Sequence, residues 1–119
     1  MNISGLPNLR MFGGSGDYIT LADGSMVGIA KSTLSKAASP SGRLSAVAIR
    51  STDGFNWRFA AVVARAEEVP QASEGPSEGA LAILRNGTLM AVMRCDGQSG
   101  HYQPCVNVCS VSALCVCVG

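Results

Sequence analysis

Two charged residues at the ends of one apolar stretch are the side chains best suited to chemistry in this sequence. Glu78 stands before the apolar run Ala80–Leu84, and Arg94 follows the run Leu89–Met93. A glutamate can take the proton of a neighbouring hydroxyl group, and a guanidinium binds a carboxylate through two parallel hydrogen bonds. Whether the two residues can act together depends on how the chain between them folds.

The apolar runs are separated by Arg85-Asn86-Gly87-Thr88. Asn-Gly between two apolar runs is the strongest short-range signal for a β-hairpin, because both residues tolerate positive φ. The runs are apolar almost throughout, which predicts that both faces of the strand pair are covered. The stretch 78–94 is therefore predicted to be an inner hairpin of a sheet.

The length of the hairpin loop decides whether Glu78 and Arg94 meet. A two-residue loop would put them on different faces of the sheet. A three-residue loop, with Gly87 as the left-handed residue, pairs Leu84 with Thr88 and therefore Glu78 with Arg94. The alternative to a functional pair is an ion pair at the rim of the sheet, worth less than about 1 kcal/mol.

Composition excludes several function classes. The chain has 119 residues and a formal net charge of +1. It has no basic patch interleaved with aromatic residues, so we expect no nucleic-acid partner. No apolar run approaches the length of a membrane span, and the first residues lack the pattern of a signal peptide, so we expect no membrane association. No cofactor is indicated, and neither the compartment nor the oligomeric state is determined.

The cysteines are confined to one end of the sequence, at positions Cys95, Cys105, Cys109, Cys115 and Cys117. An odd number leaves at least one thiol unpaired. Their spacing lacks paired CxxC motifs and the only histidine is His101, so we expect no metal site. Free thiols in a strand rich in valine and cysteine are the interpretation we favour, and residues 106–119 are predicted to add a strand to the second hairpin.

The remaining segments predict an all-β fold. No stretch has a convincing helical period. Residues 1–16 are expected to be irregular, Asp17–Lys31 to form a hairpin around Ala22–Ser25, and Leu44–Arg50 and Phe59–Arg65 to be strands. Loops are expected over Ser32–Arg43 and Glu67–Ser77, which are rich in serine, proline and glycine.

The two hairpins repeat each other at an offset of 63 residues. At this offset Leu21 matches Leu84, Gly24 matches Gly87, and Ser25 matches Thr88; Ile29 also matches Val92, and Lys31 matches Arg94. Two further strands lie between the copies. Four strands in each repeat, with a period near 60 residues, are typical of the blades of a β-propeller.

The turn Ser51-Thr52-Asp53-Gly54-Phe55-Asn56-Trp57 resembles the Asp-box (BNR repeat) of the sialidase, or neuraminidase, superfamily. The matching residues are Ser51, Asp53, Gly54 and Trp57, and the copy is one residue short. An aspartate suits such a turn because its carboxylate accepts hydrogen bonds from backbone N–H groups that follow it. The resemblance implies a structural role for this turn, on the outer strands and away from the catalytic centre.

The resemblance extends to the predicted hairpin 78–94. In sialidases the corresponding glutamate activates a tyrosine nucleophile, and an arginine helps to bind the carboxylate of sialic acid. The resemblance therefore implies that Glu78 is the catalytic base partner and Arg94 a substrate-binding residue. It further implies an exo-α-sialidase, a glycoside hydrolase that acts on sialylated glycans.

The sequence also departs from the family pattern. The chain has a lysine, Lys31, where a second arginine of the clamp is expected, and its two tyrosines do not match the position of the nucleophile. We therefore expect residues 1–104 to be a partial propeller of about two blades, with blade-like repeats at about 17–65 and 78–119. Residues 105–119 are interpreted as a Cys/Val-rich tail, a divergent or artefactual end.

These departures favour a chain that is incomplete and inactive by itself as a hydrolase. The alternative is a non-catalytic propeller module that binds a glycan or a protein, because one fold can carry either function.

Overall fold

The polypeptide folds into strands almost throughout. The structure, a computed structural model, describes residues 2–5, 18–70, 72–97, 102–109 and 115–118. The strands are β1 (Asn2–Ser4), β2 (Tyr18–Thr20), β3 (Met26–Thr33), β4 (Leu44–Ser51), β5 (Asn56–Ala64), β6 (Ala72–Ile83), β7 (Leu89–Gly97), β8 (Tyr102–Cys109) and β9 (Cys115–Val118). In these ranges the only other element is a single turn of 3-10 helix, η1 (Ala66–Glu68). No helix among the described residues is long and apolar enough to cross a membrane.

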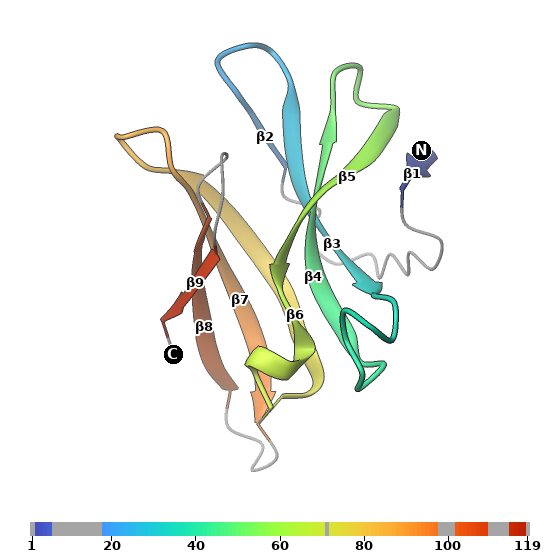
Figure 1. Cartoon of the computed structure of the whole chain (residues 1–119). Helices are drawn as coiled ribbons and strands as arrows, with labels where there is room; N and C mark the ends of the chain where they lie inside the picture. The colour runs from blue at the N-terminus through green and yellow to red at the C-terminus, as the bar shows by residue number, and fades with distance from the viewer. Residues whose placement is uncertain (1, 6–17, 71, 98–101, 110–114, 119) are drawn as a thin grey trace.

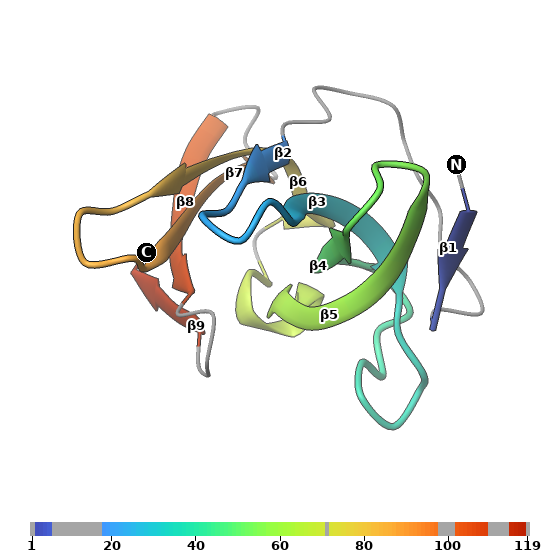
Figure 2. The ribbon, with the colours of Figure 1, turned by 90° about the horizontal axis from the view of Figure 1, so that it is seen from above.

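The strands form two sheets (Figure 1). The first has the order β1-β5-β4-β3-β2 and the second the order β6-β7-β8-β9. All neighbours are antiparallel except β1, which runs parallel to β5. Seen from above, the sheets lie beside each other as two twisted layers, with β1 and β9 on opposite sides of the molecule (Figure 2). The fold is thus all-β, with two blade-like sheets that do not close a ring, as the sequence predicts.

The two ends of the sheets differ in their connections (Figure 1). The loops that join β2 to β3, β4 to β5 and β6 to β7 are tight hairpins, and all three lie at one end, which we call the hairpin end. The longer connections 34–43 and 65–70 lie at the other end, which we call the connection end.

A buried apolar layer joins the sheets. Its members are Ala46, Val63, Ala64, Ala91 and Met93, with Ile29, Ala48 and Leu81 packed at its margin. Successive side chains of a strand point to opposite faces, so the second set on the first sheet lies on the other face. That set is Ala30, Val47, Ile49 and Trp57, covered in part by Ile3 and Phe59. The first sheet therefore carries buried side chains on both faces. The expectation of an inner hairpin over 78–94 is wrong for β6, which is an edge strand of the second sheet and leaves Ala80, Ala82 and Ile83 exposed.

Strand β6 approaches β4 very closely at Gly75. A Cβ atom built on Gly75 would lie 2.0 Å from the Leu44 carbonyl oxygen, and Gly75 has a φ of +91°. Both facts require glycine, because L side chains rarely adopt this backbone conformation and no side-chain atom fits in this space. The approach fixes the beginning of β6 against the first sheet.

Several predicted boundaries are wrong. Residues 1–16 were expected to be irregular, yet β1 pairs with β5; residues 6–17 lie outside the described ranges. The expected loop Glu67–Ser77 instead contains η1 and the first residues of β6. The expected strand at Phe59 begins three residues earlier, at Asn56. Pairing with β5, which is distant in sequence, makes the first residues a strand, and the close approach to β4 at Gly75 overrides the tendency of glycine and proline to form a loop at the start of β6.

Candidate functional site

The loop between β6 and β7 has the three-residue form. The Leu84 N–H donates to the Thr88 carbonyl oxygen at 2.8 Å, and the Gly87 N–H donates to the Leu84 carbonyl oxygen at 2.9 Å. Gly87 has a φ of +84°, and the Asn86 side-chain oxygen accepts a hydrogen bond from the Thr88 N–H at 3.0 Å. Leu84 therefore pairs with Thr88, the register in which the sequence placed Glu78 opposite Arg94. The two residues do not close the ends of the hairpin as expected, because β6 begins at Ala72 and β7 ends at Gly97.

The pairing of β6 with β7 becomes irregular at Glu78. The register holds from the loop to Gly79 and shifts by one residue before Pro76. In the shifted stretch two residues of β6, the second of which is Glu78, lie opposite one residue of β7, Arg94. Bulges of this kind re-aim a side chain and are frequent beside active sites. Only the backbone positions are adjacent in this sense, since both side chains lie outside the part that the structure describes.

The loop between β2 and β3 has the same geometry. The Leu21 N–H donates to the Ser25 carbonyl oxygen at 2.7 Å, and the Gly24 N–H donates to the Leu21 carbonyl oxygen at 2.9 Å. Gly24 has a φ of +82°, and Asp23 Oδ1 accepts from the Ser25 N–H at 2.9 Å. Each contact matches one in the β6–β7 loop at the offset of 63 residues, so the sequence match between the hairpins has a structural counterpart.

If the two loops are equivalent, Gly24→Ala and Gly87→Ala will destabilise the protein by similar amounts. No atom lies within 4 Å of a Cβ built at either position, so only the backbone conformation opposes alanine. We expect a loss of about 1–2 kcal/mol for each. Urea denaturation measures both, and asparagine, which tolerates positive φ, should restore part of the loss. A difference of more than about 1 kcal/mol between the alanine variants would contradict the equivalence.

The Asp53 carboxylate organises the β4–β5 turn. Its Oδ1 accepts hydrogen bonds from the backbone N–H groups of Phe55 at 2.9 Å and Asn56 at 2.8 Å, and its Oδ2 accepts from Asn56 Nδ2 at 2.8 Å. The hydrogen bonds from Asn56 and Phe55 hold the pKa of Asp53 well below its usual range. Both carboxylate oxygens therefore accept hydrogen bonds from residues of the turn itself, which is a structural role.

Ser51 and Trp57 close the same turn. Ser51 Oγ accepts from the backbone N–H of Asp53 at 3.3 Å and of Gly54 at 2.9 Å. Trp57 Nε1 donates to the Gly54 carbonyl oxygen at 3.1 Å, while the indole ring is buried. The four residues singled out in the sequence thus hold one compact turn, at the hairpin end and on β4 and β5.

Asp53 should make stability depend on pH at the acid side. Its pKa in the folded state is lowered from an ordinary value of 3.8, so the unfolded chain binds its proton first as the pH falls. The contribution to stability is therefore complete above that value and is lost as the pH falls through it toward the lowered pKa. We expect the melting temperature of wild type to fall more steeply than that of Asp53→Asn between about pH 5 and pH 2.5. Parallel curves of melting temperature against pH would contradict this role of Asp53, because the other carboxyl groups with lowered pKa values are present in both proteins.

An arginine of β4 binds the β2–β3 loop at the hairpin end, a contact that the sequence did not indicate. Arg50 Nη2 lies 2.6 Å from Asp23 Oδ2, and Arg50 Nε donates to Ser25 Oγ at 3.1 Å. The partners are 27 and 25 positions away in the chain. No local pattern could have identified the contact, because it depends on the pairing of β3 with β4.

A second polar cluster stands at the connection end. The buried Ser39 hydroxyl donates to Glu67 Oε1 at 2.7 Å, and the Ser41 N–H donates to the same oxygen at 3.0 Å. Hydrogen bonds from Ser41 and Ser39 lower the pKa of Glu67 to about 2. Glu67 thereby holds the 34–43 loop against η1. The sequence showed a serine-rich loop, but it did not indicate that Glu67 accepts the hydrogen bonds from Ser39 and Ser41.

The cysteine tail is described only by its backbone. One added strand was expected from residues 106–119; the structure has two, β8, which already begins at Tyr102, and β9, and they complete the second sheet. The side chains of all five cysteines lie outside the described part. Among the side chains that are described, no group of three His, Cys, Asp or Glu residues comes together as in a metal site.

Comparison with known proteins gives a fold relationship. No protein-family model matches the sequence, and no curated protein matches it. A solved structure of a β-xylosidase (RS223-Beta-xylosidase) is similar, with a TM-score of 0.60 and 13% sequence identity. The match covers 86% of this chain and 32% of that chain, so this chain spans about a third of the β-xylosidase. The chain therefore shares its all-β fold with part of a protein named as a glycoside hydrolase.

Proposed function

We propose that this chain is part of a sialidase-like glycoside hydrolase, and that Glu78 and Arg94 belong to its carbohydrate site. The observation that carries the proposal is the bulge of β6, in which Glu78 lies opposite Arg94. The resemblance implies an acid and a base on neighbouring strands of this hairpin, and a break in the regular pairing is a place where side chains are re-aimed.

Two further observations support the proposal. The Ser51–Trp57 turn is held by hydrogen bonds from Asp53 and Ser51, as a structural Asp-box would be. It joins β4 to β5 in the first sheet, whereas Glu78 lies midway along β6 in the second sheet, so the turn and the proposed site belong to different sheets. The likeness to a β-xylosidase supports glycosidase chemistry in general, without selecting the sugar.

The proposed roles follow from the residue types. The Arg94 guanidinium would bind the carboxylate of a terminal sialic acid through two parallel hydrogen bonds. Glu78 would accept the proton of a tyrosine nucleophile, as glycosidases that use tyrosine require. Neither Tyr18 nor Tyr102 matches the position of that tyrosine in the family. We therefore propose that the chain recognises sialosides but does not cleave them alone.

The test measures binding and turnover separately. We expect the purified chain to bind 3′-sialyllactose in an NMR titration, with lactose giving no saturable shifts, and to release no sialic acid. Removing a guanidinium that makes charged hydrogen bonds should weaken binding at least about tenfold, so Arg94→Ala should lose it. Arg85→Ala removes an exposed arginine at the other end of the same hairpin and should leave the affinity unchanged.

Other outcomes would change the assignment. Equal binding of lactose, or binding of xylobiose in place of sialyllactose, would reject the specificity for sialic acid. Release of sialic acid that is lost in Glu78→Ala would mean that the chain is catalytically complete. Binding of sialyllactose without turnover under all conditions, even with further propeller segments added, would favour a non-catalytic glycan-binding module.

A further inference from the structure

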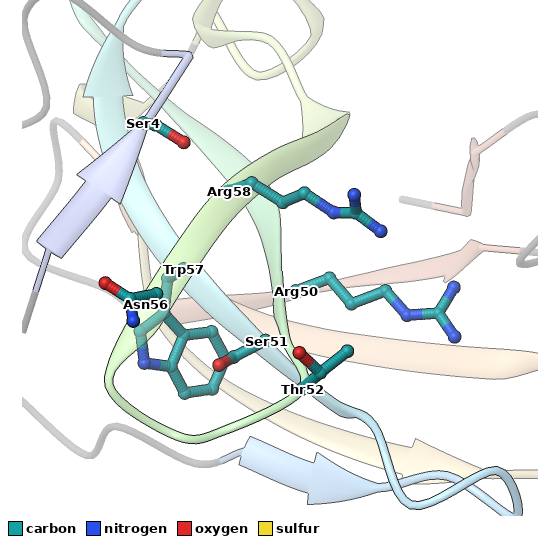
Figure 3. Close-up of a pocket in the computed structure, with 7 residues that line it drawn as sticks. All are labelled: Ser4, Arg50, Ser51, Thr52, Asn56, Trp57 and Arg58. Atoms are coloured by element: carbon teal, nitrogen blue, oxygen red, sulfur yellow. The ribbon is translucent and has the colours of Figure 1, made fainter.

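A hollow with a mixed polar and apolar lining lies on the first sheet at the hairpin end, and neither Glu78 nor Arg94 lines it. It has a volume of about 230 Å³ and is bordered by β1, β4 and β5. Its lining includes Ser4, Thr52 and Asn56 together with two arginines, Arg50 and Arg58 (Figure 3). The proposed carbohydrate site leaves this hollow without a role.

The two arginines are direct neighbours across the sheet. Arg50 of β4 is paired with Arg58 of β5 in the antiparallel register. Directly paired residues share one face, and both guanidinium groups extend side by side in the same direction (Figure 3). Like charges directly opposite each other destabilise a strand pair. An anion between the two groups would remove this repulsion.

Arg50 is held in place by the β2–β3 loop. Its Nη2 atom is 2.6 Å from Asp23 Oδ2 and 2.8 Å from Ser25 Oγ, and its Nε atom is 3.1 Å from the same hydroxyl. These contacts use Nε and Nη2. Among the described residues none accepts a hydrogen bond from Nη1. The two N–H donors of Nη1 therefore remain available to a ligand, while the contacts of Nε and Nη2 fix the position of the guanidinium group.

Arg58 differs from Arg50 in having no such anchor. Its side chain is exposed, and within the described part of the chain it takes part in no hydrogen bond or ion pair. Asp23 offsets the charge of Arg50, so the pair as a whole keeps about one uncompensated positive charge, carried by Arg58. The Arg58 fork retains all five of its donors for a ligand.

We propose that Arg50 and Arg58 form a binding site for one oxyanion, the carboxylate, sulfate or phosphate group of a ligand. Arg58 supplies a bidentate fork, and Arg50 supplies the pre-positioned Nη1 donors. The hydroxyl group of Thr52 borders the same hollow and provides a further polar contact for the remainder of the ligand, whereas the Asn56 amide already donates to Asp53.

The test is an NMR titration of the whole chain that follows the arginine Nε–Hε signals. Sodium sulfate, sodium phosphate and sodium acetate are compared with sodium chloride at equal ionic strength. We expect saturable shifts of the Arg50 and Arg58 signals with at least one oxyanion and only a uniform drift with chloride. The oxyanion that gives the tightest saturation identifies which group of a natural ligand the site takes.

Variants connect the response to the two side chains. Arg58→Ala should weaken oxyanion binding at least about tenfold, and Arg58→Lys should do so partially, because lysine keeps the charge but lacks the fork. Arg85→Ala, which removes an exposed arginine elsewhere, should have no effect. Unchanged binding in Arg58→Ala, or equal shifts with chloride and every oxyanion, would overturn the proposal.

The proposal stands apart from the proposed carbohydrate site. Arg94→Ala should abolish sialyllactose binding and leave oxyanion binding at Arg50 and Arg58 unchanged, whereas Arg58→Ala should do the reverse. Loss of both sialyllactose binding and oxyanion binding in Arg58→Ala, with an unchanged circular dichroism spectrum, would mean that the two ligands share one site.

Discussion

Trp57→Ala is expected to destabilise the protein by about 3–5 kcal/mol, the range for removing a buried tryptophan side chain. Trp57 is only 7% exposed and belongs to the buried cluster on the outer face of the first sheet. Its ring meets Tyr18 edge-on, with centroids 6.2 Å apart, and its Nε1 donates to the Gly54 carbonyl oxygen. The substitution therefore removes a core side chain and a turn contact together.

Circular dichroism during chemical denaturation measures this loss, since the variant has no tryptophan left to fluoresce. Trp57→Phe should lose less, because most of the ring contact remains while the N–H is removed. Phe55→Ala is the matched control: Phe55 lies in the same turn but is 74% exposed, so we expect a change within about 0.5 kcal/mol. Similar losses in Trp57→Ala and Phe55→Ala would contradict a core role for Trp57.

Gly75→Ala is expected to cost about 3 kcal/mol or more, because overpacking and a left-handed backbone each oppose the new methyl group. The Cβ would lie 2.0 Å from the Leu44 carbonyl oxygen, which is a backbone atom of β4 and cannot move aside alone. Strand β6 would have to withdraw from the first sheet.

Gly87→Ala provides the control for this variant. It has a φ of +84°, close to the +91° of Gly75, but no atom lies within 4 Å of its Cβ position. The difference in unfolding free energy between the two variants therefore isolates the steric clash. If Gly75→Ala were no more damaging than Gly87→Ala, the close approach of β6 to β4 would be refuted.

Local chemistry explains the parts that the sequence predicted well. Both hairpin loops were predictable from Asp23-Gly24 and Asn86-Gly87, since the side-chain acceptor and the positive φ are properties of the residues themselves. The seven-residue turn from Ser51 to Trp57 was predictable for the same reason. Loop length decides the register from the loop as far as Gly79 and Met93, but not beyond, where the pairing becomes irregular.

Features that depend on distant partners were not predictable. Strand β6 begins at Ala72 and passes through Gly75 and Pro76, residues that favour loops in isolation, because it packs against β4. The bulge at Glu78 lies between the first residues of β6, which pack against β4, and the residues from Gly79 onward, which follow the register of the hairpin. The pairing of Arg50 with Arg58 required knowledge of how β4 aligns with β5, a register that is itself interrupted by two irregularities.

The parallel pairing of β1 with β5 has a consequence for the order in which the sheets assemble. Strands β6 to β9 follow one another as a simple meander, so each can pair with its predecessor as soon as it has itself left the ribosome. Strand β1 is synthesised first, but its partner emerges only after β2, β3 and β4. Closing that long loop costs conformational entropy in return for three residues of pairing. We therefore expect β1 to join its sheet last and, in hydrogen exchange, to leave it first.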